Sequence, residues 1–420
     1  MARRDKPHRQ LRASKPLGQD GRVLGNIGTE PRFESRHTSR CASRGVVEEH
    51  AGCRYLGACV KQMSCSDCGN RVFFENLRCE VCSSSLGYAT DAQRMLAFEV
   101  SHEGSWRRLG SEGPAYRPCA NREANGCNWM VPSLTDHGLC LSCRTTHTIP
   151  ALAKSENHGY WAALEQAKRR LFYTLIELGL PTPNKREDPV NGLSFEFLEQ
   201  MNSQQRVLIG HDEGIITLDI AEADDACREH IRLSMHEPSR TLLGHFRHEI
   251  GHYYWDRLVR DTPWVTEYRS FFGDERADYD SALNTHYAWP DRDWPQHFIS
   301  AYASSHPWED WAETWAHYLH LVDGLETAAS WGAHLEFPSP SGPALKVRPL
   351  DLDAESIHEL IILQWLPVSQ FINAMDRSLG AHDSYPFVIV PPVIEKLDFI
   401  HRVVRAASAG RMPMNFLPRC

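Results

Sequence analysis

Apolar residues recur at helical spacing most clearly between positions 243 and 258. Residues three and four apart lie on one side of a helix, so this pattern predicts an amphipathic helix with a single buried face. That face consists of Leu243, Phe246, Ile250, Tyr254 and Leu258. Pro238 is suitably placed to open the helix, and Pro263 lies beyond its end.

Four further helices follow from the same kind of pattern. One is expected over about 160–178, and we expect its charged side chains to be solvated, namely Glu165, Lys168, Arg169 and Arg170. Another begins at Pro307 and has an apolar face that consists of Trp308, Trp311, Ala312, Trp315 and Leu319. The last two cover about 354–379 and 393–408.

Strand patterns are shorter and fewer. Residues 206–220 indicate two strands around a turn at 212–214, and 128–131 is a further candidate strand. Residues 144–157 are expected to be a linker, and 182–194 and 338–343 are expected to be loops because Pro, Gly or charged residues dominate them. A mainly helical chain with few strands is typical of the α+β class.

Charge separates the first 62 residues from the rest. They hold 13 Lys and Arg against 6 Asp and Glu, whereas the other 358 residues hold 32 against 48. We expect this basic head to be disordered, since it has no hydrophobic period. A nucleic-acid-binding arm and a targeting peptide are two interpretations; a third, which the composition favours, is that translation starts at Val60 or Met63 and the head is not native.

Cysteines at metal-ligand spacing follow the head. Cys65, Cys68, Cys79 and Cys82 form a CxxC-x10-CxxC pattern, in which two turns present four thiolates to one tetrahedral zinc. Disulfides or a redox pair are the alternatives. The chain has neither a secretory signal nor an apolar run of membrane-spanning length, so we expect reduced thiols and a cytoplasmic location.

A second cysteine set has one regular pair and one loose pair. It consists of Cys119, Cys127, Cys140 and Cys143 and predicts a second structural zinc, with His137 or His147 as possible substitutes for a cysteine. No basic stripe with interleaved aromatic residues accompanies it, so we expect a structural or protein-docking module rather than a nucleic-acid-binding one. The remaining cysteines receive no role, namely Cys41, Cys53, Cys59, Cys227 and Cys420.

The helix at 243–258 carries an HExxH motif. His248 and His252 leave the same helical face and can bind one metal, while Glu249 flanks them and can accept a proton from water. A chance occurrence is the alternative, since the chain contains 22 His. Downstream, Glu309 and Glu313 lie four apart on the helix that starts at Pro307. Like charges at this spacing repel, so they indicate either a nearby cation or a solvated acidic face.

The segments HFRHEIGHYYW, FGDERADYDSALNTHY and HPWEDWAETWAHYLH, together with the cysteine pairs, resemble the putative zinc-binding metallopeptidase family, found mainly in bacteria. The resemblance covers about 63–405. It implies a zinc ribbon followed by a gluzincin-like (zincin) domain, with His248, His252 and Glu309 as ligands and Glu249 as general base. In the gluzincin pattern the second carboxylate, Glu313, orients a ligand histidine.

The resemblance also directs attention to an oxyanion donor. Several gluzincins place a tyrosine hydroxyl near the metal, and Tyr302 is our candidate for this donor. Tyr287 and His286 are rival candidates, and the alternative for Tyr302 is that it only packs in the core. Zinc peptidases bind extended substrates along a free strand edge. Residues 215–218 are our candidate for that edge, and an ordinary buried strand is the alternative.

These observations predict three regions: a basic head (1–62), a zinc-ribbon domain (63–148) and a zincin-like domain (149–420). We expect a zinc metallopeptidase with one catalytic and one or two structural Zn²⁺, acting on a peptide or protein, with a possible protein partner at the ribbon and no membrane association. A non-catalytic zinc-ribbon adaptor with a structural HExxH zinc is the main alternative, and hydrolysis of a non-peptide amide is another.

Overall fold

The computed structural model describes most of the chain after the basic head. The described residues are 63–102, 106–110, 113–200, 207, 209–234, 237, 240–335, 345–348 and 356–410. All of them belong to one unit, Tyr55–Cys420. The head, Pro238 and the expected loop at 338–343 therefore lie outside the described residues. Within them, no helix is long and apolar enough to cross a membrane.

The cysteine-rich region consists of three small antiparallel sheets. Their strands are β1 (Met63–Ser64) with β2 (Arg71–Val72), β3 (Ser85–Ala89) with β4 (Arg94–Val100) and β5 (Trp106–Arg108), and β6 (Tyr116–Pro118) with β7 (Met130–Pro132). A short helix, α1 (Arg122–Asn125), ends at Gly126, whose φ of 69° gives the left-handed conformation that glycine adopts easily. The predicted strand at 128–131 corresponds to β7.

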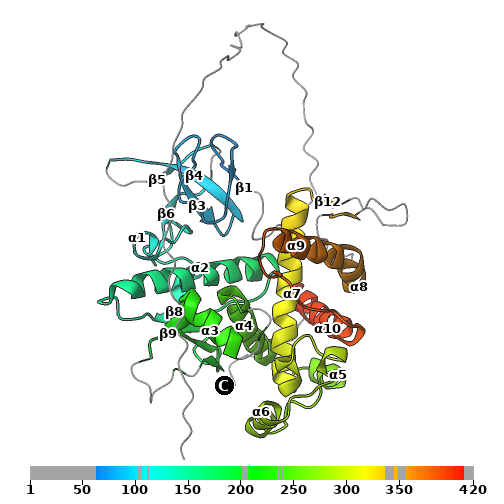
Figure 1. Ribbon diagram of the computed structural model, residues 1–420. Helices are drawn as coiled ribbons and strands as arrows, with labels where there is room; N and C mark the ends of the chain where they lie inside the picture. The colour runs from blue at the N-terminus through cyan, green and yellow to red at the C-terminus, as the bar shows by residue number, and fades with distance from the viewer. Residues whose placement is uncertain are drawn as a thin grey trace, which may run out of the picture. The chain divides into compact units, whose positions relative to one another are not determined.

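Helix α2 (Ser155–Glu177) lies between this region and the rest of the unit and contacts both α1 and α4 (Figure 1). The expectation that its charged side chains are solvated is wrong for Glu165, Lys168 and Arg169, which are buried. The cause is that α2 is covered on more than one side at these three positions, whereas 41% of the Arg170 side chain remains exposed, as expected. Glu165 and Lys168 form a buried ion pair, with Nζ 3.1 Å from Oε2.

One aromatic cluster joins α2 to the cysteine-rich region. Phe74 and Tyr88 each have their ring centroid within 5.3 Å of that of Tyr173 on α2, and Tyr88 is equally close to Trp129. All four rings are buried and belong to the same hydrophobic core as the helices that follow. The cysteine-rich region and the rest of the unit therefore share one core.

A four-stranded sheet has the order β10-β11-β9-β8. Its strands are β8 (Thr146–Thr148), β9 (Ser194–Leu198), β10 (Gly210–Asp212) and β11 (Ile215–Asp219). The predicted hairpin is present, since Asp212 pairs with Ile215 across the turn. Two expectations are wrong: β11 is paired on both sides, which leaves β10 as the edge, and β8 lies inside the expected linker and pairs in parallel with β9.

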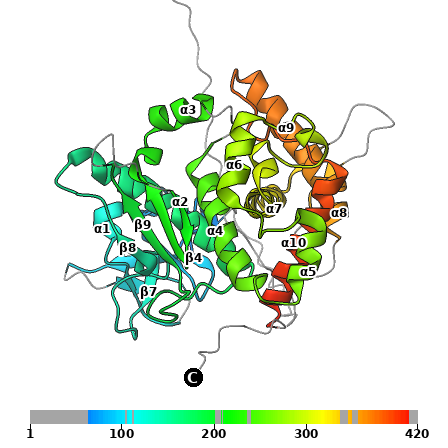
Figure 2. The same cartoon turned by 90° about the horizontal axis from the view of Figure 1, so that it is seen from below.

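Two long helices pack against each other beside this sheet. They are α4 (Leu242–Leu258) and α7 (Pro307–Ser330), and Figure 2 looks along α7 with α4 between it and the sheet. A Cβ on Gly251 would lie 3.0 Å from Cα of Ala312, so a larger residue there would push the two helices slightly apart. Nε1 of Trp311 donates to the carbonyl oxygen of Gly251 over 2.8 Å.

The start of α7 agrees with the prediction, whereas α2 begins at Ser155 rather than at about 160, and α4 begins at Leu242 rather than at Pro238. Thr241 caps α4, because its hydroxyl accepts from the backbone N–H of Gly244 at 3.0 Å. Pro307 is the first residue of α7, as predicted, and the helix continues to Ser330. The segment between α4 and α7 contains α5 (Trp264–Phe272), α6 (Tyr279–Ala288) and the 3₁₀ helices Trp294–Gln296 and Tyr302–Ser305.

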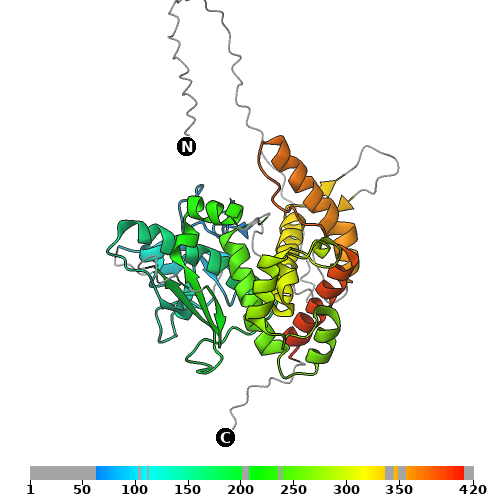
Figure 3. The same ribbon diagram turned by 60° about the horizontal axis from the view of Figure 1, so that its bottom comes forward.

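The C-terminal helices lie on the side of α7 away from the sheet (Figure 3). They are α8 (Ile357–Glu359), a π-helical turn (Leu360–Trp365), α9 (Leu366–Ser378) and α10 (Pro391–Ser408). The expected single helix over 354–379 thus contains a π turn just before Pro367, which lacks the N–H needed for a regular helical bond. A two-stranded pair, β12 (His334–Leu335) and β13 (Leu345–Lys346), precedes them.

Candidate metal centre

Three side chains from α4 and α7 converge on one point. Nε2 of His248 lies 3.2 Å from Nε2 of His252 and 3.0 Å from Oε2 of Glu309, and the remaining distance, from His252 to Glu309, is 3.5 Å. Zinc held tetrahedrally by bonds of 2.0–2.1 Å keeps its ligand atoms about 3.3 Å apart. The three predicted ligand residues therefore have the spacing of a zinc site, with a fourth position left over.

The second carboxylate of α7 contacts a histidine of α4. Oε1 of Glu313 lies 2.8 Å from Nδ1 of His248, the ring nitrogen that faces away from the convergence point. The other oxygen of Glu313 accepts from Oγ of Ser300 at 2.7 Å. When Nε2 binds a metal, Nδ1 carries the proton and donates it to this carboxylate. Ser300 had no signature in the sequence, because its position depends on how the segment before α7 folds.

Glu249 lies beside the convergence point and is nearly buried. Burial would raise the pKa of its carboxyl, but the neighbouring imidazoles of His245, His248 and His252 hold it below the usual value. Its Oε1 faces Nε2 of His245 at 3.5 Å, and its Oε2 has no hydrogen-bond partner within the described part of the chain. One carboxylate oxygen is thus positioned and the other is left to interact with a small molecule.

His245 connects Glu249 to a second buried carboxylate. Its Nδ1 lies 3.6 Å from Oε2 of Glu222, a residue of the 3₁₀ helix Ile220–Ala223 that is 1% exposed. Arg240 holds Glu222 through Nη2 and Nε, at 2.7 and 3.3 Å. Burial would lower the pKa of His245, but Glu222 and Glu249 raise it above its usual value. Sequence reasoning missed His245, although its four-residue spacing from Glu249 places both on one helical face.

Two tyrosines approach the site from the segment between the long helices. The hydroxyl of Tyr279, at the start of α6, donates to Oε1 of Glu309 over 2.7 Å, a contact that we did not predict. The ring of Tyr302 lies 6.0 Å from that of His248, and burial raises the pKa of its hydroxyl far above the usual value. Of its two rivals, His286 lies 6.4 Å from Tyr302 between ring centroids, and Tyr287 is 61% exposed.

Three further histidines lie near this region: His306 and His317 are buried, and His320 is half-buried. His306 caps α7 by accepting from the backbone N–H of Trp308 at 3.1 Å. Nδ1 of His317 lies 2.9 Å from the hydroxyl of Tyr385, and His320 contacts Arg247. Each has a structural partner away from the convergence point.

Each cysteine set brings its four sulfurs within 4.8 Å of one another. The sulfur separations are 3.7 Å for Cys65–Cys82, 3.6 Å for Cys68–Cys79 and 3.7 Å for Cys127–Cys140. A disulfide requires about 2.05 Å, whereas four thiolates 2.3 Å from one zinc lie about 3.8 Å apart. Cys119 and Cys143 complete the second cluster, so neither His137 nor His147 is needed there. The donor types and spacings fit zinc at both clusters.

Comparisons with known proteins agree with this chemistry. Residues 157–403 match the family described as putative zinc-binding metallo-peptidase, and residues 62–154 match a zinc-ribbon domain. Uncharacterized proteins of Mycobacterium bovis and of two Mycobacterium tuberculosis strains are 41% identical over 347 residues, which is 82% of this chain and 95% of each relative. No solved structure matches the chain. The protein therefore belongs to the putative zinc-binding metallo-peptidase family and carries a zinc ribbon ahead of its peptidase region.

Proposed function

We propose that the protein is a zinc-dependent peptidase with a gluzincin-like active site on α4 and α7. His248, His252 and Glu309 hold the catalytic zinc, and Glu313 orients His248. The two cysteine clusters hold structural zinc. When bound at the active site, zinc supplies a Lewis acid that polarises the scissile carbonyl and lowers the pKa of water.

Glu249 is the general base in this proposal. Its carboxylate takes a proton from the attacking water and then gives it to the leaving amine. The observation that carries the assignment is its environment: the group is buried, ionised and adjacent to the ligand atoms, and one oxygen has no partner in the described part of the chain. A zinc site with a purely structural role has no use for such a group, which favours the enzyme over an adaptor.

His245 and Tyr302 assist the reaction in different ways. His245, held by Glu222, keeps the carboxylate of Glu249 ionised and oriented. Tyr302 keeps its proton at all working pH values because burial raises the pKa of its hydroxyl, so it can donate to the oxyanion that forms on the substrate. Tyr279 fixes the second oxygen of Glu309, which leaves Oε2 for the metal.

The substrate in this proposal is an extended peptide that pairs with β10. This strand is the sheet edge that contacts α4, and it is three residues long. Strand addition supplies backbone hydrogen bonds that do not depend on substrate sequence. With so short an edge, side-chain contacts must supply most of the selectivity.

The test is a comparison of peptides released from a cell lysate by the wild type and by Glu249→Gln. The variant keeps the shape of the side chain but removes the proton acceptor, so cleavage should fall by about 10²–10⁴-fold. Zinc content, measured on the same samples, should stay unchanged. Equal cleavage by the two proteins would disprove water activation by Glu249.

A further inference from the structure

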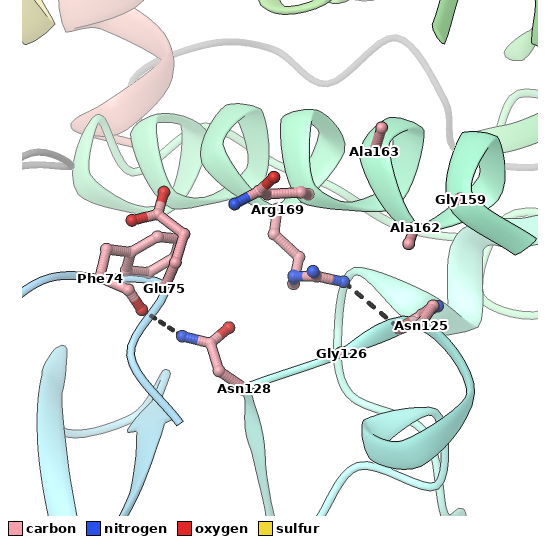
Figure 4. Close-up of a pocket in the computed structure, with 10 residues that line it drawn as sticks. Phe74, Glu75, Asn125, Gly126, Asn128, Gly159, Ala162, Ala163 and Arg169 are labelled. Carbon is pink, nitrogen blue, oxygen red and sulfur yellow. Dashed lines mark hydrogen bonds between the residues drawn. The ribbon is translucent and has the colours of Figure 1, made fainter. Parts of the chain in front are cut away.

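A cavity of about 360 Å³ lies between α2 and the cysteine-rich region, apart from the active site (Figure 4). Its walls come from three segments: the loop after β2, the stretch from the end of α1 to β7, and the first half of α2. Nothing in the proposed peptidase chemistry uses it. Its volume is at the lower end of the range found for small-molecule sites.

Arg169 of α2 extends into this cavity, and its side chain is almost fully buried at 4% exposure. Within the described part of the chain, its guanidinium has one weak polar contact, from Nη1 to Oδ1 of Asn125 at 3.5 Å. Among the described residues, no carboxylate oxygen lies within 4.0 Å of it, whereas the adjacent Lys168 and Arg170 pair with Glu165 and Glu75. A buried cation without a counter-ion is costly, so the cavity favours an anion.

A second donor lies in the wall of the same cavity. Asn125 is 3% exposed, and its Nδ2 has no hydrogen-bond partner in the part of the chain that the structure describes. The neighbouring Asn128 is already engaged, because its amide nitrogen donates to the carbonyl oxygen of Phe74 (Figure 4). Arg169 and Asn125 therefore offer a guanidinium and an unused amide N–H₂ to one ligand.

The other walls restrict which anion fits. The carboxylate of Glu75 lines the cavity and repels a dianion more strongly than a monoanion. Phe74, Ala162 and Ala163 supply apolar surface that suits an organic group. The planar fork of a guanidinium matches the two oxygens of a carboxylate.

We propose that this cavity binds a small organic monocarboxylate through Arg169 and Asn125. The carboxylate can belong to a free short-chain acid or to the C-terminus of a short peptide, since both present the same group. Binding there links the ribbon side of the cavity to α2. The proposal does not depend on peptidase activity.

The experiment detects ligand binding by saturation-transfer NMR with the full-length zinc-loaded protein. The observed probes are propionate, N-acetylglycine and its amide N-acetylglycinamide, and inorganic phosphate, which has no carbon-bound proton to observe, is added as a competitor. Arg169→Gln removes the charge, and Gly159→Leu fills the cavity. A Cβ at Gly159 meets no atom of the described residues within 4 Å, so the helix accepts the larger residue. Arg186→Gln, on an exposed loop, is the matched control for charge loss.

We expect transfer to propionate and N-acetylglycine in the wild type and in Arg186→Gln, and at least a fivefold loss in both cavity variants. N-acetylglycinamide should give no signal. A stronger signal for propionate indicates a free acid, and a stronger signal for N-acetylglycine indicates a peptide C-terminus. Displacement of propionate by an equimolar amount of phosphate, or an unchanged propionate signal in Arg169→Gln, would overturn the proposal.

The active-site metal can also bind carboxylates, so His252→Ala is included. A signal from this cavity persists in His252→Ala and disappears in Arg169→Gln. The opposite pattern would assign the binding to the metal centre and overturn the proposal.

Discussion

Nδ1 of His248 lies 2.8 Å from Oε1 of Glu313, while Nε2 of the same ring lies 3.0 Å from Oε2 of Glu309. The two carboxylates of α7 therefore face opposite nitrogens of one imidazole. One carboxylate is placed to share a metal with His248, and the other is placed to fix its tautomer. This geometry separates two roles that the four-residue spacing alone left open.

The first prediction distinguishes these carboxylates. Glu309→Ala removes a direct ligand and should leave the active site empty at submicromolar free zinc. Glu313→Ala should retain zinc but bind it about ten- to a hundredfold more weakly, because it removes only the partner of a ligand. Chelator titration measures both affinities, and the reverse order would assign the metal to Glu313.

The second prediction concerns His245. Replacing it with Gln keeps a hydrogen-bonding group but removes the imidazole, whose pKa Glu222 and Glu249 raise, so kcat should fall about 10- to 100-fold while KM and zinc content stay unchanged. Glu222→Gln should also lower kcat, because Glu222 influences Glu249 through His245. The double variant should then be little slower than His245→Gln alone; fully additive losses would show that the two residues act separately.

The third prediction uses pH. Burial is the main cause that raises the pKa of Asp256 on α4 to about 6, against a nearby Arg260 that lowers it. Between pH 4 and 6 the folded state then binds a proton that the unfolded state has released, so this carboxyl's contribution to stability is present at pH 4 and lost as pH rises through 6.

Asp256→Asn does not titrate and removes this dependence. Relative to the wild type, the variant should gain up to about 3 kcal/mol of unfolding free energy between pH 4 and pH 8, at about 1.4 kcal/mol per pKa unit. Urea unfolding of both proteins at the two pH values gives the difference. A constant difference would show that Asp256 is ionised when folded throughout this range.

The fourth prediction concerns the cysteine clusters. Purified protein should hold about three zinc ions, and Cys127→Ser should lose one and lower the thermal midpoint of the whole unit by on the order of 10 °C, because Cys127 is fully buried in the shared core. Cys68→Ser alters an exposed ligand of the other cluster and should have a smaller effect. Two separate unfolding transitions in Cys127→Ser would argue against a shared core.

Helical periodicity predicted α4, α7 and α10 well because each has one continuous apolar face. Periodicity did not predict that charged side chains of α2 are buried. Glu165, Lys168 and Arg169 have the composition of a solvated face, yet a second layer of chain covers them, and nothing local in a sequence reports such a layer. The short strands β8 and β9 were missed for a related reason, since their pairing joins segments far apart in the chain.

The candidate metal centre likewise combines residues that local spacing predicts with residues that only tertiary packing brings in. His248, Glu249 and His252 share one helix, so their spacing was sufficient to bring them together. Glu309 and Glu313 needed a second helix, and the resemblance to a known family supplied the link. Tyr279 and Ser300 come from irregular segments whose positions depend on tertiary packing, and no local pattern indicated them.

The aromatic cluster around Tyr173 has a consequence for the order of folding. During synthesis the cysteine-rich region leaves the ribosome before α2. In the folded protein, however, Tyr88 packs against Tyr173 of α2, and Trp129 packs against Tyr88. Until α2 has emerged, the apolar side of the nascent ribbon is open to water and to other chains. Early zinc binding by its thiolates would hold the region together during that interval, so zinc supply during translation should affect the yield of folded protein more than zinc supply afterwards.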